Sequence, residues 1–345
     1  MSRTIRMARA RDRDYQDIED VSQLIADLKE KATEDMNLDD IPEEDERNER
    51  NERNEENFRF SEESDDDVEH SVTRKPSTLS LNVHSKGKRT IQIKELDLDI
   101  IPPSHSEFMN PDHTGSKIAV IGKPGTGKSS LIRSILFEKS EIFPCGQIYS
   151  GTEDSNHSYG KFLPSTFIHN SFDQTAYMDF IRRQKIAKKW LANPWSVCVW
   201  DDITEDAKIF NHPIIQGTYK NGRHWKMLHI LSLQYSLDIK PVIRTNIDGT
   251  FILRETNKMN RKRLFENYAS AIDDYSDFCS ILDQVTNNYT SLYIHNRVQS
   301  NNFEDCVYWY KARNDIPDDF KFGCKEYWMF HEERYNPLYI DPINV

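Results

Sequence analysis

The sequence has few cysteines, and they form no recognisable pattern. There are five, an odd number, and no two of them make a C-x-x-C pair. Spacings of this kind give no support to a zinc site or to a disulfide framework, so we expect reduced and mostly buried thiols. The five are Cys145, Cys198, Cys279, Cys306 and Cys324.

Long hydrophobic runs are also missing. No stretch approaches the ~18 consecutive apolar residues that a membrane span needs. The N-terminus, MSRTIRMARARDRD, has no apolar stretch after its arginines, so it does not have the pattern of a secretory signal. We therefore expect no membrane span and a soluble protein that works inside a cell or is packaged in a particle.

Outside the N-terminal quarter, the sequence has no excess of either charge. Of the 45 Lys and Arg and the 57 Asp and Glu, residues 1–80 hold 13 and 25, so 32 of each sign remain in the rest of the chain. The whole net charge of −12 therefore lies in residues 1–80. The acidic balance does not exclude DNA binding by the remainder, because a balanced domain can still segregate its charges on one face.

The N-terminal segment, residues 1–87, contains one candidate helix in an otherwise highly charged stretch. Within residues 16–32, apolar side chains recur at helical spacing, as Ile18, Val21, Leu24, Ile25 and Leu28. A helix this short needs a surface to pack on, which either a partner or the chain's own domain could supply. The following stretch has three tandem Asn-Glu-Arg units and almost no large apolar groups, which is typical of a disordered tether.

From residue 88 to 345 the pattern is that of an α/β domain. RTIQIKELDLDII (89–101) alternates like a strand, and KIAVIG, QIYSG, TFIHNSF (166–172), WSVCVWDD, KMLHILSLQYS and GTFILRE follow as strand candidates. Most of these apolar runs do not alternate, and helical stretches such as 129–139 and 173–192 separate them. This favours a mainly parallel sheet with helices on both faces. In such sheets, ligands bind beyond the carboxyl ends of the strands.

A complete phosphate-loop motif, G-x-x-x-x-G-K-[ST], occupies residues 122–129 between a predicted strand and a predicted helix. Its glycines allow backbone N–H groups to surround phosphate oxygens, Lys128 can reach the β- and γ-phosphates, and the Ser129 hydroxyl can ligate Mg²⁺. We therefore expect ATP and Mg²⁺ as ligands. The predicted nucleotide-binding residues are Gly122, Pro124, Gly125, Thr126, Gly127, Lys128, Ser129 and Ser130.

Two adjacent acids end the buried strand VCVWDD, about 70 residues after the phosphate loop. We assign Asp201 to the metal, together with Ser129, and Asp202 to the base that polarises the attacking water. A kinase or GTPase would not need the second acid. The pair therefore favours an ATPase that performs mechanical work.

Gln234 ends the next predicted strand, where it could sense the γ-phosphate and orient the water. Arg223 lies at the opposite end of the same strand, separated from its own nucleotide by about 25 Å. It could instead reach the nucleotide of a neighbouring subunit in a ring, as a trans-acting arginine; a structural role is equally compatible with its spacing. Arg244 and Arg254 are weaker candidates for this function, and His224 is expected to be a packing residue.

Taken together, GKPGTGKSSLI, VCVWDD, NGRH before HILSLQ, and PVIRTNIDGTFILRE resemble the genome-packaging ATPases of nucleocytoplasmic large DNA viruses and virophages. The poxvirus packaging ATPase is their best-known relative, within the FtsK–HerA superfamily of ring-forming DNA pumps. The resemblance covers roughly residues 115–260. The acidic N-terminal segment has no counterpart in it, and the second acid is Asp202 where many superfamily members carry Glu.

The resemblance implies an additional-strand P-loop NTPase core and a homo-oligomer in the form of a hexameric ring. It also implies ATP-driven movement of double-stranded DNA into a preformed capsid, a capsid or portal-vertex partner, and a location in the virion or the infected cell's cytoplasm. On the family pattern, the metal-binding acid matches Asp201, the catalytic acid Asp202, the arginine finger Arg223 and the sensor glutamine Gln234. The last ~85 residues show no nuclease-like acidic cluster, unlike the two-part terminases of tailed phages.

Two other functions remain open. One is a cellular-type ring translocase or helicase of the same superfamily, and the other is a structural protein that binds nucleotide and hydrolyses it slowly. Two basic stretches are candidate DNA or subunit contacts: Arg182 to Trp190, with Lys185, Lys188 and Lys189, and the run Arg261, Lys262 and Arg263. For the first of these, a solvated helix face is the favoured explanation.

Overall fold

The structure is a computed structural model that describes residues 77–83, 89–203, 207–300 and 302–336. The predicted helix at 16–32 lies outside these residues. All the described residues belong to one unit of the chain.

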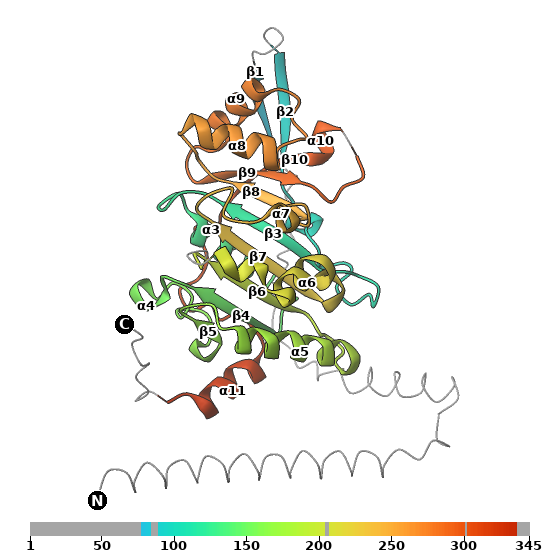
Figure 1. Ribbon diagram of the computed structural model, residues 1–345, viewed down its shortest axis with the longest axis vertical. Coiled ribbons are helices and arrows are strands. Elements are labelled where there is room, and N and C mark those ends of the chain that lie inside the picture. The colour runs from blue at the N-terminus through green and yellow to red at the C-terminus, as the bar shows by residue number, and fades with distance from the viewer. Residues whose placement is uncertain (1–76, 84–88, 204–206, 301, 337–345) are drawn as a thin grey trace, which may run out of the picture. The chain divides into compact units, whose positions relative to one another are not determined.

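A ten-stranded sheet forms the centre of the described structure, in the order β1-β2-β10-β9-β8-β3-β7-β6-β4-β5 (Figure 1). All neighbours from β8 to β5 are parallel, whereas β1–β2, β10–β9 and β8–β9 are antiparallel. The mainly parallel P-loop NTPase sheet is therefore confirmed. The strands are β1 Thr78–Val83, β2 Arg89–Glu95, β3 Ser116–Ile121, β4 Cys145–Ser150, β5 Ile168–His169, β6 Ser196–Asp201, β7 Met227–Leu233, β8 Gly249–Ile252, β9 Thr290–His295 and β10 Val307–Lys311.

Helices connect most of the parallel strands, and polar side chains begin several of them. Asp173 accepts hydrogen bonds from the backbone of Thr175 and Ala176 at the start of α5, and Asn257 caps α8 in the same way. The helices are α3 Lys128–Glu138, α4 Glu153–Asn156, α5 Gln174–Trp190, α6 Pro213–Asn221, α7 Pro241–Arg244, α8 Lys258–Tyr268, α9 Tyr275–Val285, α10 Phe303–Cys306 and α11 Lys325–Arg334, with 3-10 turns η1 Leu98–Ile100, η2 Ser165–Phe167, η3 Ala207–Asn211 and η4 Gly222–Trp225.

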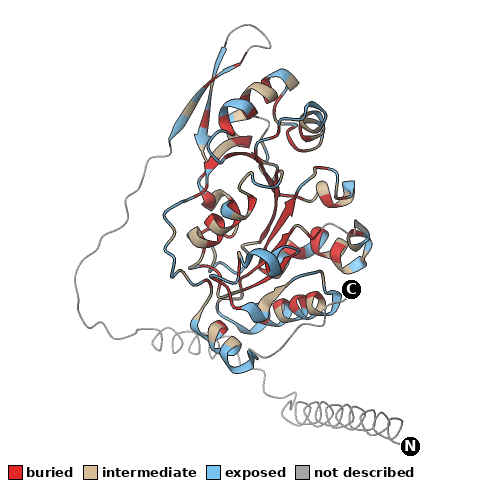
Figure 2. Ribbon diagram, turned by 90° about the vertical axis from the view of Figure 1, so that its left-hand side faces the viewer, coloured by how far each residue is buried: buried red, intermediate tan, exposed pale blue. Residues whose placement is uncertain are grey.

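The sheet separates two hydrophobic cores, and the central strands contribute to both. In β3, Ile118 and Val120 face the core that α3 covers, while Ala119 and Ile121 face the core that α5, α6, α8 and α9 cover. Because successive side chains of a strand point to opposite faces, a strand covered on both sides must be apolar throughout. Figure 2 shows the resulting buried centre between more exposed outer surfaces.

Two predicted strands are shorter in the structure. Of 166–172, only Ile168–His169 pairs with β4, because η2 precedes it and turns Phe167 onto Tyr327, with ring centroids 4.4 Å apart. The strand predicted over 89–101 ends at Glu95, since the Asp97 carboxylate accepts from the backbone of Asp99 and starts η1. The sheet also includes β1, which lies before the boundary that we predicted at residue 88.

A titratable side chain, His229, is buried in the middle of the mostly apolar strand β7. His229 is fully buried between the rings of Trp200 and Tyr219, at centroid distances of 5.0 and 5.3 Å. Neither ring nitrogen has a hydrogen-bond partner in the described part of the chain. Burial, with a smaller contribution from the charge of Lys117, lowers the pKa of His229 to about 3. The fold therefore requires the neutral imidazole.

This burial predicts a specific loss of stability in acid. In the unfolded chain His229 binds a proton near its ordinary pKa of about 6.5, so below that pH the unfolded state holds more protons than the folded state. The free energy of unfolding therefore falls by about 1.4 kcal/mol for each pH unit below 6.5. We expect His229→Leu to remove this component, measured as the difference in the free energy of unfolding between pH 7 and pH 5.5. The exposed His224→Leu is the control, and an unchanged pH dependence in His229→Leu would contradict the prediction.

Candidate active site

The phosphate-loop motif forms the turn between β3 and α3. Gly125 and Gly127 have φ angles of 76° and 99°, in the left-handed region that glycine adopts without strain. At Gly122, a β-carbon would lie 2.5 Å from Thr126 Oγ1 and 2.9 Å from Leu253 Cβ, so close packing excludes a side chain. Thr126 closes the turn by donating from both its N–H and its hydroxyl to the Lys123 carbonyl oxygen, at 3.2 and 2.7 Å.

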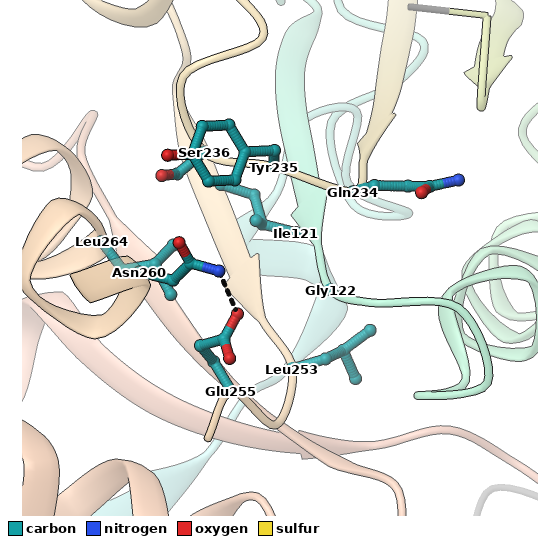
Figure 3. Close-up of a pocket in the computed structure, with 9 residues that line it drawn as sticks. All are labelled: Ile121, Gly122, Gln234, Tyr235, Ser236, Leu253, Glu255, Asn260 and Leu264. Carbon is teal, nitrogen blue, oxygen red and sulfur yellow. Dashed lines mark hydrogen bonds between the residues drawn. The ribbon is translucent and has the colours of Figure 1, made fainter. Parts of the chain in front are cut away.

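A buried glutamate anchors the loop from the side. Glu255, just beyond β8, lies 2.7 Å from Lys123 Nζ, and it also accepts from the Asn257 backbone and the Asn260 side chain (Figure 3). Burial acts to raise the pKa of Glu255, but these hydrogen bonds outweigh it and hold the pKa below its usual range. The carboxylate is therefore charged and fixes the position of Lys123. Our sequence interpretation did not find this residue.

Asp201, the last residue of β6, is brought into contact with the first turn of α3. Its Oδ2 accepts from Ser129 Oγ at 3.2 Å and from the hydroxyl of Tyr159 at 2.8 Å. Asp201 is buried, and its other oxygen, Oδ1, has no hydrogen-bond partner among the described residues. A buried carboxylate oxygen of this kind costs free energy unless a donor or cation satisfies it.

The arrangement of Ser129 and Asp201 fits Mg²⁺. This ion prefers oxygen ligands, and it is commonly held by one or two protein groups together with phosphates and water. Within the described residues there is no cluster of three or more His, Cys, Asp or Glu that could hold a metal by themselves. The hydroxyl of Ser129 and the unpaired oxygen of Asp201 are therefore the groups that could bind the ion beside a nucleotide.

Asp202 lies beside Lys128, the first residue of α3. Its backbone is left-handed, with φ 52°, and its Oδ1 lies 3.7 Å from Lys128 Nζ. Burial raises the pKa of Asp202, and the Asp201 charge adds to this, while Lys128 and a hydrogen bond with Gln234 act in the opposite direction. The net shift is upward, which brings the carboxyl closer to the proton affinity that suits a general base near neutral pH.

Gln234 reaches this site from the strand between the two motifs. The sheet places β7 between β3 and β6, so the residue after β7 lies between the phosphate loop and the acids. Gln234, Glu255 and Asn260 line a pocket beside the end of β3. Figure 3 shows the Gln234 side chain directed away from Glu255 and Asn260. The structure thus brings together Lys128, Ser129, Asp201, Asp202 and Gln234. Pro124, Gly125 and Ser130 lie exposed along the loop and the first turn of α3.

Arg223 lies elsewhere, at the amino end of β7. Its guanidinium is 3.3 Å from Asp248 Oδ1, and its side chain keeps 34% of its surface exposed. Asp248 also accepts from the backbone of Lys117 at 2.9 Å. Within this chain Arg223 therefore has an ion-pair partner at the end of β7 opposite to Gln234. The other two arginines proposed for this function also have partners: Arg244 donates to the Ile239 carbonyl and Arg254 to Asn287.

The two basic stretches differ in how many charges they leave free. On α5, Lys188 and Lys189 are exposed beside Trp190, which is 79% exposed, whereas the Arg183 guanidinium stacks on Phe180. In α8, Arg261 forms two hydrogen bonds with Asp283, and Arg263 stacks on Tyr235. The α5 stretch therefore presents the more accessible positive charge.

Tyr159 is a site residue that our sequence interpretation missed. It lies between α4 and η2, with no motif around it, and only the fold brings its hydroxyl to Asp201. The nearby Glu153 carboxylate, which accepts from the backbone of Tyr159 and Gly160, fixes this turn. Glu255, by contrast, is the last residue of the predicted strand GTFILRE, so its position at a strand end was the one available signal.

Comparisons with known proteins show relatives in large DNA viruses. The chain is 49% identical to the uncharacterized protein 088R of Invertebrate iridescent virus 3 over 247 residues, which cover 71% of this chain and 95% of that protein. It is also 35% identical to the uncharacterized protein 015R of Frog virus 3 over 242 residues, covering 70% and 74% of the two chains. The chain belongs to this family of proteins from large DNA viruses. The predicted link to such viruses is thereby confirmed.

Solved structures give a more distant likeness, and no family model matches the chain. The genome-packaging NTPase B204 of Sulfolobus turreted icosahedral virus 2, in complex with AMPPCP, is 15% identical with a TM-score of 0.42, and the match covers 59% of this chain and all of B204. The sequence relatives, rather than this likeness, establish the family. No helix in the described part of the chain is long and apolar enough to cross a membrane.

The contact of Tyr159 with Asp201 predicts a defect in metal binding. We expect Tyr159→Phe to raise the Mg²⁺ concentration for half-maximal ATP hydrolysis about tenfold, because residues that orient a metal ligand typically contribute 10- to 100-fold to metal affinity. Affinity for ATP without Mg²⁺ should not change. Tyr177→Phe, which removes an equally buried hydroxyl that bonds to Thr218, is the matched control. If both variants respond to Mg²⁺ like the wild type, Tyr159 does not position Asp201.

Proposed function

We propose that this chain is an ATPase that translocates double-stranded DNA and packages a viral genome into a preformed capsid. The observation that carries the proposal is the meeting of Lys128, Ser129, Asp201 and Asp202 at one edge of the sheet, with Gln234 on the strand between them. Membership of a family from large DNA viruses supports a viral function for this motor. The proposal includes assembly into a ring of six subunits that works in the virion or in the cytoplasm of the infected cell.

The site would divide the work of hydrolysis among its residues. Lys128 and the backbone of the phosphate loop would bind the β- and γ-phosphates, and Ser129 and Asp201 would hold Mg²⁺, which neutralises phosphate charge when bound. Gln234 would orient a water molecule and Asp202 would accept its proton as the water oxygen attacks the γ-phosphorus. ADP then leaves with the electrons of the broken P–O bond.

Arg223 remains our proposal for the residue that acts on a neighbouring subunit's nucleotide. What supports this is its place at the opposite edge of the sheet and the third of its side chain that stays exposed. Asp248 would keep a backbone donor and Lys117, whose Nζ lies 4.0 Å away, if Arg223 turned outward. The exposed lysines of α5 are our proposal for contacts with DNA phosphates, which would make binding sensitive to salt.

DNA-stimulated ATP hydrolysis tests the proposed function. We expect double-stranded DNA to increase the hydrolysis rate of the wild-type protein severalfold, and the particle mass in solution to correspond to a ring. Asp202→Asn should bind ATP with wild-type affinity and hydrolyse it at least about 100-fold more slowly, because the side chain can no longer accept a proton. A monomer whose slow hydrolysis ignores DNA would instead support a nucleotide-dependent structural protein. Wild-type turnover by Asp202→Asn would mean that another residue is the base.

Mixed rings test the position of Arg223. If this residue acts on the neighbouring site, Arg223→Ala and Lys128→Ala subunits should each be inactive alone and recover part of the activity when mixed, because some interfaces then combine an intact Lys128 with an intact Arg223. Asp248→Asn serves as the control for loss of the ion pair alone. No recovery in rings shown to contain both subunits would favour a structural role.

A further inference from the structure

An exposed aromatic side chain stands directly beside the phosphate loop. A β-carbon built on Gly127 would lie 3.1 Å from Tyr289 Cδ1 and 3.8 Å from Tyr289 Cβ, so the tyrosine covers the backbone of the last glycine in the motif. Even so, 68% of Tyr289 remains exposed. The Tyr289 ring is therefore accessible to a ligand that binds at the phosphate loop.

The backbone that presents this tyrosine is strained. Asn288 and Tyr289 both have left-handed φ angles, 54° and 59°, although neither is glycine. Asparagine tolerates this region, but a bulky aromatic residue rarely adopts it, and such outliers concentrate at ligand-binding sites. The strain here directs the Tyr289 ring toward the phosphate loop.

Surrounding contacts hold the turn in this conformation. The Thr290 N–H donates to the Asn287 carbonyl at 3.2 Å, and Arg254 Nη1 donates to the Asn287 side-chain oxygen at 2.7 Å. Arg254 follows β8, the strand next to β3, so the turn is attached to the same part of the sheet as the loop. Arg254 thereby positions the turn that carries Tyr289.

The strand order determines which end of a nucleotide would meet Tyr289. At the carboxyl edge of the parallel strands the sequence of neighbours is β9, β8, β3, β7 and β6. Asp201 and Asp202, at β6, mark the end where the γ-phosphate must lie if they act on it. A nucleotide held by its phosphates on the loop after β3 therefore extends its base to the other side, toward β8 and β9, where Tyr289 precedes β9.

We propose that Tyr289 binds the base of the nucleotide by stacking against its face. The inference rests on the proposed binding of ATP to the phosphate loop and specifies how the base end of ATP is recognised. An aromatic ring contacts the π face that all bases share, so this contact supplies affinity for a nucleoside over bare triphosphate rather than a choice between adenine and guanine.

Binding of ATP, GTP and inorganic tripolyphosphate to the full chain separates the base contact from the phosphate contact. We expect Tyr289→Ala to weaken ATP and GTP binding on the order of tenfold, as for loss of one base–aromatic stack, and to leave tripolyphosphate binding unchanged. Tyr289→Phe should bind all three like the wild type. Tyr335→Ala, which removes another exposed tyrosine, is the matched control, and circular dichroism would confirm that each variant folds.

The outcomes distinguish this inference from the proposed function. Lys128→Ala should lose both ATP and tripolyphosphate, because it removes the phosphate contact. If the wild type binds ATP and Tyr289→Ala binds it equally well, the stacking role is overturned while the ATPase proposal stands. The same holds if Tyr289→Ala weakens tripolyphosphate binding as much as it weakens ATP binding. If the wild type binds neither ATP nor tripolyphosphate, both fail.

Discussion

Two contacts that cross the end of strand β7 hold the candidate site together. Ser129 reaches Asp201, and Lys128 lies beside Asp202, although their strands β3 and β6 are not neighbours. Two strand spacings amount to about 10 Å, which short side chains on the strand ends could not bridge. The glycine-rich turn solves this by placing the first turn of α3 over the edge of the sheet. The buried strand β7, which pairs with both β3 and β6, then fixes their separation.

A second group of charged side chains meets at the amino ends of the parallel strands β3, β7 and β8. Lys117 is buried in β3, where its Nζ donates to the Tyr219 carbonyl and lies near Asp248. Burial lowers the pKa of Lys117 to about 8, a shift that the neighbouring Asp248 carboxylate partly offsets. Arg223 joins this group from the surface. The same arginine can thus serve the fold within one subunit and, as we propose, a neighbouring site across a ring, since Asp248 keeps other partners.

Local sequence patterns were sufficient for the central sheet and for the residues that end its strands. Apolar runs located β3, β4, β6 and β7, and the two motifs located Lys128 and Asp201, because these features depend on neighbours in sequence. The length of β5 was overestimated, since the packing of Phe167 on Tyr327 of the distant helix α11 decides where that strand begins. Tyr159 and Tyr289 could not be predicted for the same reason. Each reaches the site only through tertiary contacts, with Asp201 and with Gly127 respectively.

Three consecutive residues beyond β8 connect the parts of the site that lie on the side of the phosphate loop away from β6. Leu253 packs against Gly122, Arg254 holds the turn of Tyr289 through Asn287, and Glu255 holds Lys123. The phosphate loop and the Tyr289 turn are therefore attached to one short segment rather than to each other. A displacement of the loop must either carry this segment along or break a buried carboxylate's ion pair, which is costly when the partner is lost. The base end and the phosphate end of a bound nucleotide would consequently be positioned as one unit, with α8 attached to it through Asn260.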